Sequence, residues 1–182
     1  VKVTKDKFSE INGIIHSAGV SKDSFILKKT TEEIQQVINP KIHGAINLDT
    51  ATKDENLDLF VLFSSIAGVL GNFGQCDYAY GNHFLDAFAG YRTNLVNDNA
   101  RFGKTLSINW AFWEDGGIRL SENEIAQGKE HIGIYPIETT VGLEYFEQFL
   151  SSEITQGVAL YGEKSKIDAY VQHNVKDENN ED

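Results

Sequence analysis

The run Asp58-Leu59-Phe60-Val61-Leu62-Phe63-Ser64-Ser65 decides the fold of this chain. A continuous apolar stretch of this length predicts a strand that is buried on both faces of a parallel sheet. Comparable runs recur along the chain, and the predicted strands are Ile11 to His16, Asp58 to Ser64, Thr105 to Trp110 and Gly157 to Tyr161. Longer stretches of helical period separate them, and this alternation predicts an α/β fold with a doubly wound parallel sheet.

The helix between the first two strands has a clear beginning. Thr30 and Glu33 form the pattern of a capping box, and apolar residues follow at helical spacing as far as Ile46. Pro40 lies inside this helix and lacks a backbone donor, so we expect a kink just before Lys41. The two other long helices are predicted at Gln75 to Asn97 and Ile137 to Leu150.

The composition is that of a folded protein that does not bind nucleic acid. The chain has 182 residues, of which 41% are hydrophobic and 24% charged, and these values fit one globular domain. The formal net charge is −11, and no cluster of basic residues is longer than the pair Lys28-Lys29. We therefore expect neither DNA nor RNA as a partner.

Cys76 is the single cysteine, which excludes an internal disulfide and leaves no metal-ligand set. We expect it to be a small buried side chain in a reducing compartment. No apolar run approaches the ~18 residues of a membrane span, and the charged first residues do not form a signal peptide. The sequence thus predicts a cytoplasmic protein with no membrane partner and no metal.

Residues 114–135 form a polar segment that glycines interrupt, with a weak helical stretch near Glu122 to Lys129. The segment follows the predicted strand that ends at Trp110. Ligands of α/β proteins bind at the carboxyl ends of the strands. The segment is therefore either a mobile lid over a substrate or an ordinary surface insertion.

A group of polar residues follows the second strand. Tyr78 comes thirteen residues after Ser65, and Asn82 lies one helical turn beyond Tyr78. Reduction of a carbonyl needs a hydride, a proton for the oxygen and a donor that holds this oxygen, and tyrosine and serine supply the last two. A phenol has a pKa near 10, so a nearby cation has to lower that pKa, and Lys41 is the candidate.

This spacing resembles the short-chain dehydrogenase/reductase superfamily, in which most members carry a lysine four residues after the tyrosine. Here Asn82 occupies that place and Lys41 precedes Ser65 by twenty-four residues, an exchange similar to that in ketoreductase domains of modular polyketide synthases. Further similar segments are His16-Ser17-Ala18-Gly19-Val20, Gly74-Gln75-Cys76-Asp77-Tyr78-Ala79, Phe84-Leu85-Asp86-Ala87 and Ile108-Asn109-Trp110 leading to Trp113. The resemblance covers about residues 8 to 165, and it implies the C-terminal catalytic part of such a domain.

The resemblance implies a role for each of these polar residues. Tyr78 would protonate the carbonyl oxygen, Ser65 would hydrogen-bond it, Lys41 would bind the nicotinamide ribose, and Asn82 would support a proton relay. The cofactor would be NADPH, bound also by Ala18, Gly19 and Tyr78. His16 would be structural, as would Ser64. Each residue also has an ordinary alternative: a serine cap, a packed tyrosine, a solvated lysine and a surface amide.

The same resemblance bears on stereochemistry. Asp23 is the aspartate kept from the Leu-Asp-Asp signature of B-type ketoreductases, and Leu70 stands where A-type domains carry a tryptophan. Gln75 and Trp113 would border the acyl pocket. These residues favour a D-configured alcohol, formed from a β-ketoacyl chain on an acyl carrier protein.

The resemblance implies a Rossmann-like sheet that lacks its first strands. No glycine-rich turn precedes Ile11, so the phosphate-binding part is absent and tight NADPH binding by this chain is not expected. The edge of the first strand would be open to another chain. Residues 1–170 are predicted as a partial catalytic domain, and residues 171–182 as an acidic tail or linker.

Three explanations remain for the missing half. They are an excerpt of the parent enzyme, a fragment that a partner completes, and a truncated domain kept for its structure. The chain also contains no methionine, which suggests a processed fragment or an excerpt from a larger polypeptide. The remainder of the ketoreductase domain would then be a partner. Two functions remain as alternatives to the polyketide reductase: a fatty-acid-synthase type of ketoreductase, and a non-catalytic interaction fragment.

Overall fold

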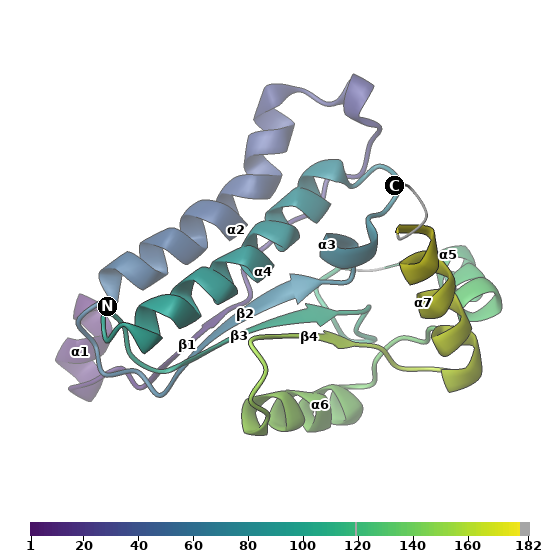
Figure 1. The fold of residues 1–182 in the computed structure, drawn as a ribbon. Helices are drawn as coiled ribbons and strands as arrows, with labels where there is room; N and C mark the ends of the chain where they lie inside the picture. Colours follow the sequence, from purple (N-terminus) through teal and green to yellow (C-terminus); the bar gives the residue numbers. More distant parts are fainter. Residues whose placement is uncertain (119, 179–182) are drawn as a thin grey trace. The chain divides into compact units, whose positions relative to one another are not determined.

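The computed structural model describes residues 1–118 and 120–178. Its strands are β1 (Gly13–His16), β2 (Leu59–Ser65), β3 (Lys104–Trp110) and β4 (Gln156–Ala159). They form one sheet in the order β1-β2-β3-β4, and β2 is parallel to both of its neighbours (Figure 1). The α/β architecture is confirmed, and the ends of the predicted strands differ from the observed ones by no more than two residues.

Two long helices cover one face of this sheet (Figure 1). They are α2 (Thr31–Ala51) and α4 (Cys76–Asn97). The predicted capping box begins α2, with the Thr30 hydroxyl accepting from the Glu33 amide at 3.2 Å and the Glu33 carboxylate accepting from the Thr30 amide at 2.9 Å. Pro40 lies inside the helix, which continues without a break to Ala51.

The remaining helical segments are α1 (Lys2–Phe8), the 3₁₀ helix η1 (Ile26–Lys28), α3 (Ala67–Leu70), α5 (Glu122–Gln127), the π-helix η2 (Gly128–Ile132), α6 (Thr139–Ser151) and α7 (Lys164–Glu178). Four of them, α1, η1, α3 and α7, were not predicted. α1 buries no residue, and its sequence lacks the apolar stripe from which an amphipathic helix is predicted. α7 extends through much of the predicted tail, and residues 179–182 of that tail lie outside the described residues.

The chain divides into two compact units. The first contains residues 1–110 and 147–158, and the second contains residues 111–146 and the described residues from 159 onward. In the second unit, Trp113 pairs with Ile137 through an isolated bridge, and the Glu114 amide donates to the Ile137 carbonyl at 2.9 Å. Gly142 lies beneath the Trp113 ring, because a Cβ at Gly142 would come within 2.3 Å of that indole.

The main core of the first unit lies between the sheet and the two long helices. Phe60 and Leu62 of β2 are fully buried against residues of α2 and α4, including Ala45, Leu85 and Ala89. The opposite face carries the alternate residues of β3, where the Trp110 ring meets Phe149 edge-on at 6.3 Å. Both faces of the central strands are therefore covered, as their continuous apolar sequence predicts.

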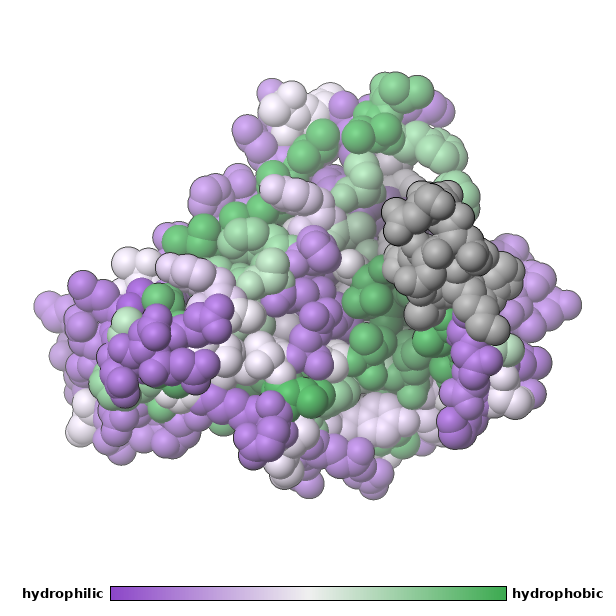
Figure 2. Space-filling model, in the orientation of Figure 1, coloured by the Kyte–Doolittle hydropathy of each residue, from purple (hydrophilic) through white to green (hydrophobic). Residues whose placement is uncertain are grey.

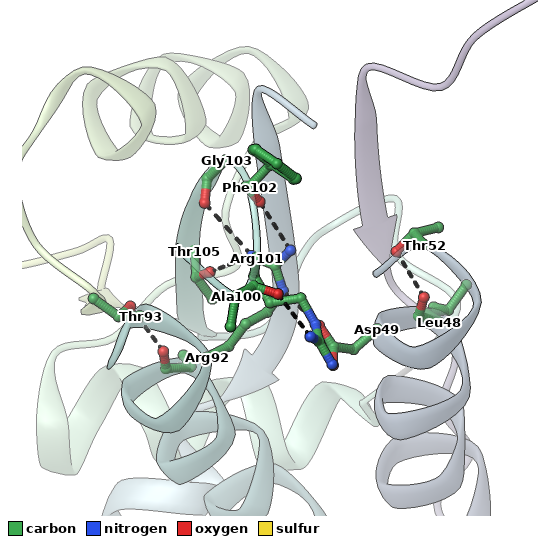
Figure 3. A network of polar contacts seen from close by, with 11 residues as sticks. Leu48, Asp49, Thr52, Arg92, Thr93, Ala100, Arg101, Phe102, Gly103 and Thr105 are labelled. Carbon is green, nitrogen blue, oxygen red and sulfur yellow. Dashed lines mark hydrogen bonds and ion pairs between the residues drawn. The ribbon is translucent and has the colours of Figure 1, made fainter. Parts of the chain in front are cut away.

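Arg92 forms a buried charged cluster at the opposite end of α4 from Tyr78 (Figure 3). Its guanidinium bonds to Asp49 of α2 at 2.9 Å and to the Thr105 hydroxyl of β3 at 2.7 Å. Arg101 binds the same carboxylate at 2.9 Å, and the Arg92 guanidinium stacks over Phe60 at 4.4 Å. The cluster joins two helices to the start of a strand, and it was not predicted from the sequence.

β1 is an edge strand, as predicted. Within residues 1–118 and 120–178 it pairs only with β2, and Ile15 is 53% exposed. Cys76 corrects a prediction, because its side chain is exposed rather than buried; it occupies the first position of α4, outside the core. Within the described part of the chain, no helix is long and apolar enough to cross a bilayer.

Candidate active site

The candidate site lies in the first unit, where the ends of three strands meet the beginning of α4. His16 ends β1, Ser65 ends β2 and Trp110 ends β3, and Ser65 is in register with Trp110. Parallel strands bring these ends to one edge of the sheet. Tyr78 lies in the first turn of α4 and is buried, so the helix brings its phenol to the same edge.

Tyr78, Ser65 and Asn82 come together as the sequence predicts. The side chains of Ser65 and Asn82 both act on the pKa of the Tyr78 hydroxyl, which places them around it. The Asn82 amide nitrogen donates to the Tyr78 backbone carbonyl at 2.8 Å, and its Oδ1 is buried without a hydrogen-bond partner among the described residues. Asn82 is fully buried and is therefore not a surface amide.

Ser65 has a capping role in addition. Its hydroxyl accepts from the Ala67 amide at 3.2 Å, at the beginning of the short helix α3. A hydroxyl that accepts one hydrogen bond still has its own proton to donate. The cap therefore orients the hydroxyl oxygen, and the same side chain also hydrogen-bonds the Tyr78 hydroxyl.

The pKa of Tyr78 moves in the direction opposite to the predicted one. Burial raises the pKa of the phenol above its ordinary value of 10, and this effect outweighs the lowering by Ser65 and Asn82. The charge of Asp23 raises the pKa further. Tyr78 is therefore a neutral phenol at neutral pH, which is the protonation state that a proton donor needs.

Lys41 is buried in the site, with only 4% of the residue exposed. Its ammonium lies 5.6 Å from the centroid of the Tyr78 ring and donates to the Phe63 carbonyl at 3.1 Å. Burial lowers the pKa of Lys41 to about 8, although the carboxylate of Asp86 opposes this shift. Lys41 is thus not a solvated surface charge, and at pH 7 it is still mainly a cation.

The depressed pKa of Lys41 makes folding pH-dependent. Between the folded pKa of about 8 and the ordinary value of 10.5, the unfolded state binds more protons, so stability rises with pH. Relative to a Lys41→Met variant, we expect the wild type to gain about 2 kcal/mol of unfolding free energy between pH 7 and pH 9.5. Urea unfolding at several pH values measures this gain, and parallel curves for the two proteins would contradict it.

Behind the site lies a buried polar network that was not predicted from the sequence. Asp86 accepts from Ser107 at 2.6 Å and from Asn109 at 2.7 Å, and Asn109 also donates to the Ser64 hydroxyl at 3.0 Å. Ser64 in turn donates to the backbone carbonyl of Asn82 at 3.1 Å. The network anchors the end of β2 to α4 through hydrogen bonds that satisfy buried groups.

Two sequence signals could have revealed this network. Tyr78, Asn82 and Asp86 follow one another at intervals of four residues, which places all three on one face of a helix. Ser107 and Asn109 are polar residues that alternate with the apolar residues Leu106, Ile108 and Trp110 of the same strand. Buried polar groups need partners, so their pairing with Asp86 follows from the fold.

The proposed stereocontrol residues divide between the two units. Asp23 and Gln75 meet in the first unit, where the Gln75 amide donates to the Asp23 carboxylate at 2.7 Å. Leu70 ends α3 and is exposed. Trp113 belongs to the second unit.

The segment after β1 contains the predicted cofactor-binding residues. Ala18 and Gly19 are exposed, and a Cβ at Gly19 would lie 3.3 Å from the Lys41 ammonium. Glycine therefore leaves room directly beside this cation. His16 is buried against Gly44, and burial lowers its pKa, so it is a neutral imidazole packed under α2.

The arrangement has a definite chemical capacity. A neutral phenol and a serine hydroxyl converge near the end of β2, and a buried ammonium lies over the phenol ring, 5.6 Å from its centroid. These groups can donate hydrogen bonds to one carbonyl oxygen and supply it with a proton. The fold and this group of residues are those of the short-chain dehydrogenase/reductase superfamily.

Comparison with known proteins identifies the family. Residues 1–115 match the KR domain family, and the chain belongs to this family of ketoreductase domains in polyketide synthases. Polyketide synthase PksN of Bacillus subtilis (strain 168) is 41% identical over 161 residues, which are 88% of this chain and 3% of that protein. Polyketide synthase PksL of the same strain is 40% identical over 185 residues, 97% of this chain and 4% of that protein.

Solved structures agree with this assignment. A ketoreductase domain from the bacillaene assembly line has a TM-score of 0.90 and 42% identity, covering 93% of this chain and 40% of that one. An N-terminal ketoreductase from the macrolactin assembly line has a TM-score of 0.81 and 42% identity, covering 93% of this chain and 32% of that one. The chain thus spans less than half of the solved ketoreductases and a small share of the synthases.

Proposed function

We propose that this chain provides the catalytic residues of a β-ketoacyl thioester reductase, in which Tyr78 protonates the ketone oxygen. The observation that carries the proposal is the neutral, buried phenol of Tyr78, which lies beside Ser65 and within 5.6 Å of the Lys41 ammonium. The products of polyketide chain extension carry a ketone at the β-carbon. Membership of the KR domain family supports this substrate class.

The proposed reaction uses two donors on one oxygen. Ser65 donates a hydrogen bond to the β-keto oxygen and orients it. The Ser65 hydroxyl is itself held in place because its oxygen accepts from the Ala67 amide. Tyr78 transfers its proton to the same oxygen as the carbon accepts a hydride, so a β-hydroxy group and a tyrosinate result. Lys41 stabilises this tyrosinate through its positive charge, and Asn82 orients the phenol before a new proton arrives.

NADPH supplies the hydride when it is bound, and the residues present fit its nicotinamide ribose. The Lys41 ammonium has three donors, one of which goes to the Phe63 carbonyl at 3.1 Å. Gly19 leaves the space beside that ammonium open, since a Cβ there would come within 3.3 Å of it. Lys41 would hold the ribose hydroxyls, and the backbone of Ala18 and Gly19 would line the same place.

The proposal extends to the stereochemical outcome and to the partner. Asp23 hydrogen-bonds Gln75 and acts on the pKa of Tyr78, so an acidic side chain borders the approach to the phenol. With Leu70 in place of a tryptophan, we propose B-type reduction to the D-configured alcohol. The acyl chain would arrive on the phosphopantetheine arm of an acyl carrier protein in the synthase.

NADPH oxidation tests this proposal directly. The native-length protein is expected to oxidise NADPH when a β-ketoacyl pantetheine thioester is added, and chiral chromatography is expected to give the D-alcohol as the main product. A reaction without thioester controls for idle oxidation. A native-length protein that forms no alcohol contradicts the proposed function, and an L-alcohol contradicts the stereochemical part alone.

A further inference from the structure

A buried ion pair lies next to the candidate site and has no part in the mechanism above. The Lys29 ammonium and the Asp77 carboxylate are 2.8 Å apart, and each side chain is 1% exposed. Removing two charges from water is costly, and such a pair often adds no stability over apolar residues of the same size. Its presence therefore calls for a reason other than stability.

The ion pair connects two segments of the first unit. On one side, the other oxygen of Asp77 accepts from the backbone amide of Tyr78 at 2.9 Å. On the other side, the Lys29 ammonium also donates to the backbone carbonyl of Lys22. The pair thus links the residue that carries the phenol to both ends of the loop formed by residues 22–29.

This loop has little apolar burial to hold it in place. Its 3₁₀ helix η1 buries no residue, and Leu27 is 96% exposed. Figure 2 shows the apolar side chains of this region at the surface, near the top of the view. Hydrophobic packing therefore contributes little to the position of the loop, and polar contacts at its base have to provide it.

Three of those polar contacts reach the beginning of α4, while the Lys22 ammonium donates to the Gln36 side chain of α2. Besides the ion pair, Asp23 accepts from Gln75 at 2.7 Å, and the Ser24 amide donates to the Gly74 carbonyl at 2.9 Å. The Asp23 contact is exposed, whereas the ion pair is buried. A buried, charge-assisted contact is the stronger of the two.

We propose that the Lys29–Asp77 ion pair is a positioning element, which holds the loop of residues 22–29 against the first turn of α4. It thereby sets the distance between Asp23 and the Tyr78 phenol, and with it the face of the ketone that the site accepts. This inference rests on the proposed function, because it concerns the geometry of that same reaction. Neither Lys29 nor Asp77 touches the reacting atoms.

The test compares Lys29→Gln, Asp77→Asn and the double variant in the native-length protein. Each single change leaves one buried charge without its partner and releases the loop, so kcat is expected to fall about 10- to 100-fold while KM changes much less. The share of the minor alcohol enantiomer is expected to rise. In the double variant the losses are expected to be smaller than the product of the two single effects, because the two residues act as a pair.

Asp49→Asn is the matched control. It breaks a buried ion pair with Arg92 that is similarly exposed and lies at the opposite end of α4. Its Tm is expected to fall by about as much as the Tm of the Lys29 and Asp77 variants, while its enantiomer ratio stays at the wild-type value. If a Lys29 or Asp77 variant does not fold, Gln75→Ala removes the exposed contact of the same loop. That variant is expected to shift the enantiomer ratio in the same direction.

The outcomes separate the two proposals. An unchanged enantiomer ratio and kcat in the Lys29 and Asp77 variants, with turnover in the wild type, overturns the inference and leaves the proposed function in place. A ratio that shifts equally in Asp49→Asn also overturns it, since general destabilisation then explains the change. A wild-type protein without turnover overturns the proposed function, and this inference with it.

Discussion

Tyr78→Phe is expected to lower kcat for reduction of a β-ketoacyl thioester about 1000-fold, because it removes the only proton that the mechanism gives to the ketone oxygen. Burial keeps the phenol neutral, so the wild type holds this proton at neutral pH. Phenylalanine fills the same buried space. The fold and the hydrogen bond from the Ser65 hydroxyl to the substrate are therefore expected to remain.

The loss is measured as steady-state alcohol formation at saturating NADPH and thioester. Tyr80→Phe is the matched control, since Tyr80 lies on the same helix, is 61% exposed and loses the same hydroxyl. Its kcat is expected to equal that of the wild type. If Tyr78→Phe retained a tenth or more of the wild-type kcat, Tyr78 would not be the proton donor.

Asp49→Asn is expected to lower the free energy of unfolding by about 3–5 kcal/mol, because it leaves the buried guanidinium of Arg92 without a counter-charge. Arg92 is fully buried and Asp49 is 5% exposed, so water cannot replace the lost carboxylate. The pKa of Arg92 is already lowered, chiefly by burial, and Asp49 is the group that opposes this shift. As Figure 3 shows, Arg101 depends on the same carboxylate.

Chemical denaturation measures this loss. Lys164→Gln provides the comparison, because it breaks an ion pair with Asp168 of 2.7 Å whose side chains are 86% and 50% exposed. Exposed pairs contribute little, so that variant is expected to lose less than about 1 kcal/mol. Similar losses of unfolding free energy in Asp49→Asn and Lys164→Gln would show that burial does not determine how much the Asp49 cluster stabilises the fold.

Much of the fold could be predicted because local patterns and buried surface agree. The apolar run at Leu59–Ser65 predicts a central strand, and the capping box at Thr30 predicts where α2 begins, and both are confirmed. Prediction failed for α1 and α7, whose sequences carry no clear apolar stripe. It also failed for Cys76, because a small side chain carries no information about which face of a helix it occupies.

The candidate site, too, could be predicted only in part from the sequence. The spacing of Ser65, Tyr78 and Asn82 on a strand end and a helix predicts their juxtaposition, since both elements have fixed repeats. The roles of these residues stay predictions that the experiments above test. The direction of the Tyr78 pKa was wrong, because desolvation depends on how deeply the phenol is buried, and no residue spacing reports that.

The amino-acid sequence alone therefore predicted the class of fold, the strand ends and the family of ketoreductase domains, because these depend on short-range periodicity and on motifs. Contacts between segments far apart in the sequence required the tertiary structure. Lys29 and Asp77 are separated by 48 positions, and Arg92 and Asp49 by 43. Such buried charge pairs arise only when packing removes both partners from water, which is a property of the assembled layers and not of any local pattern.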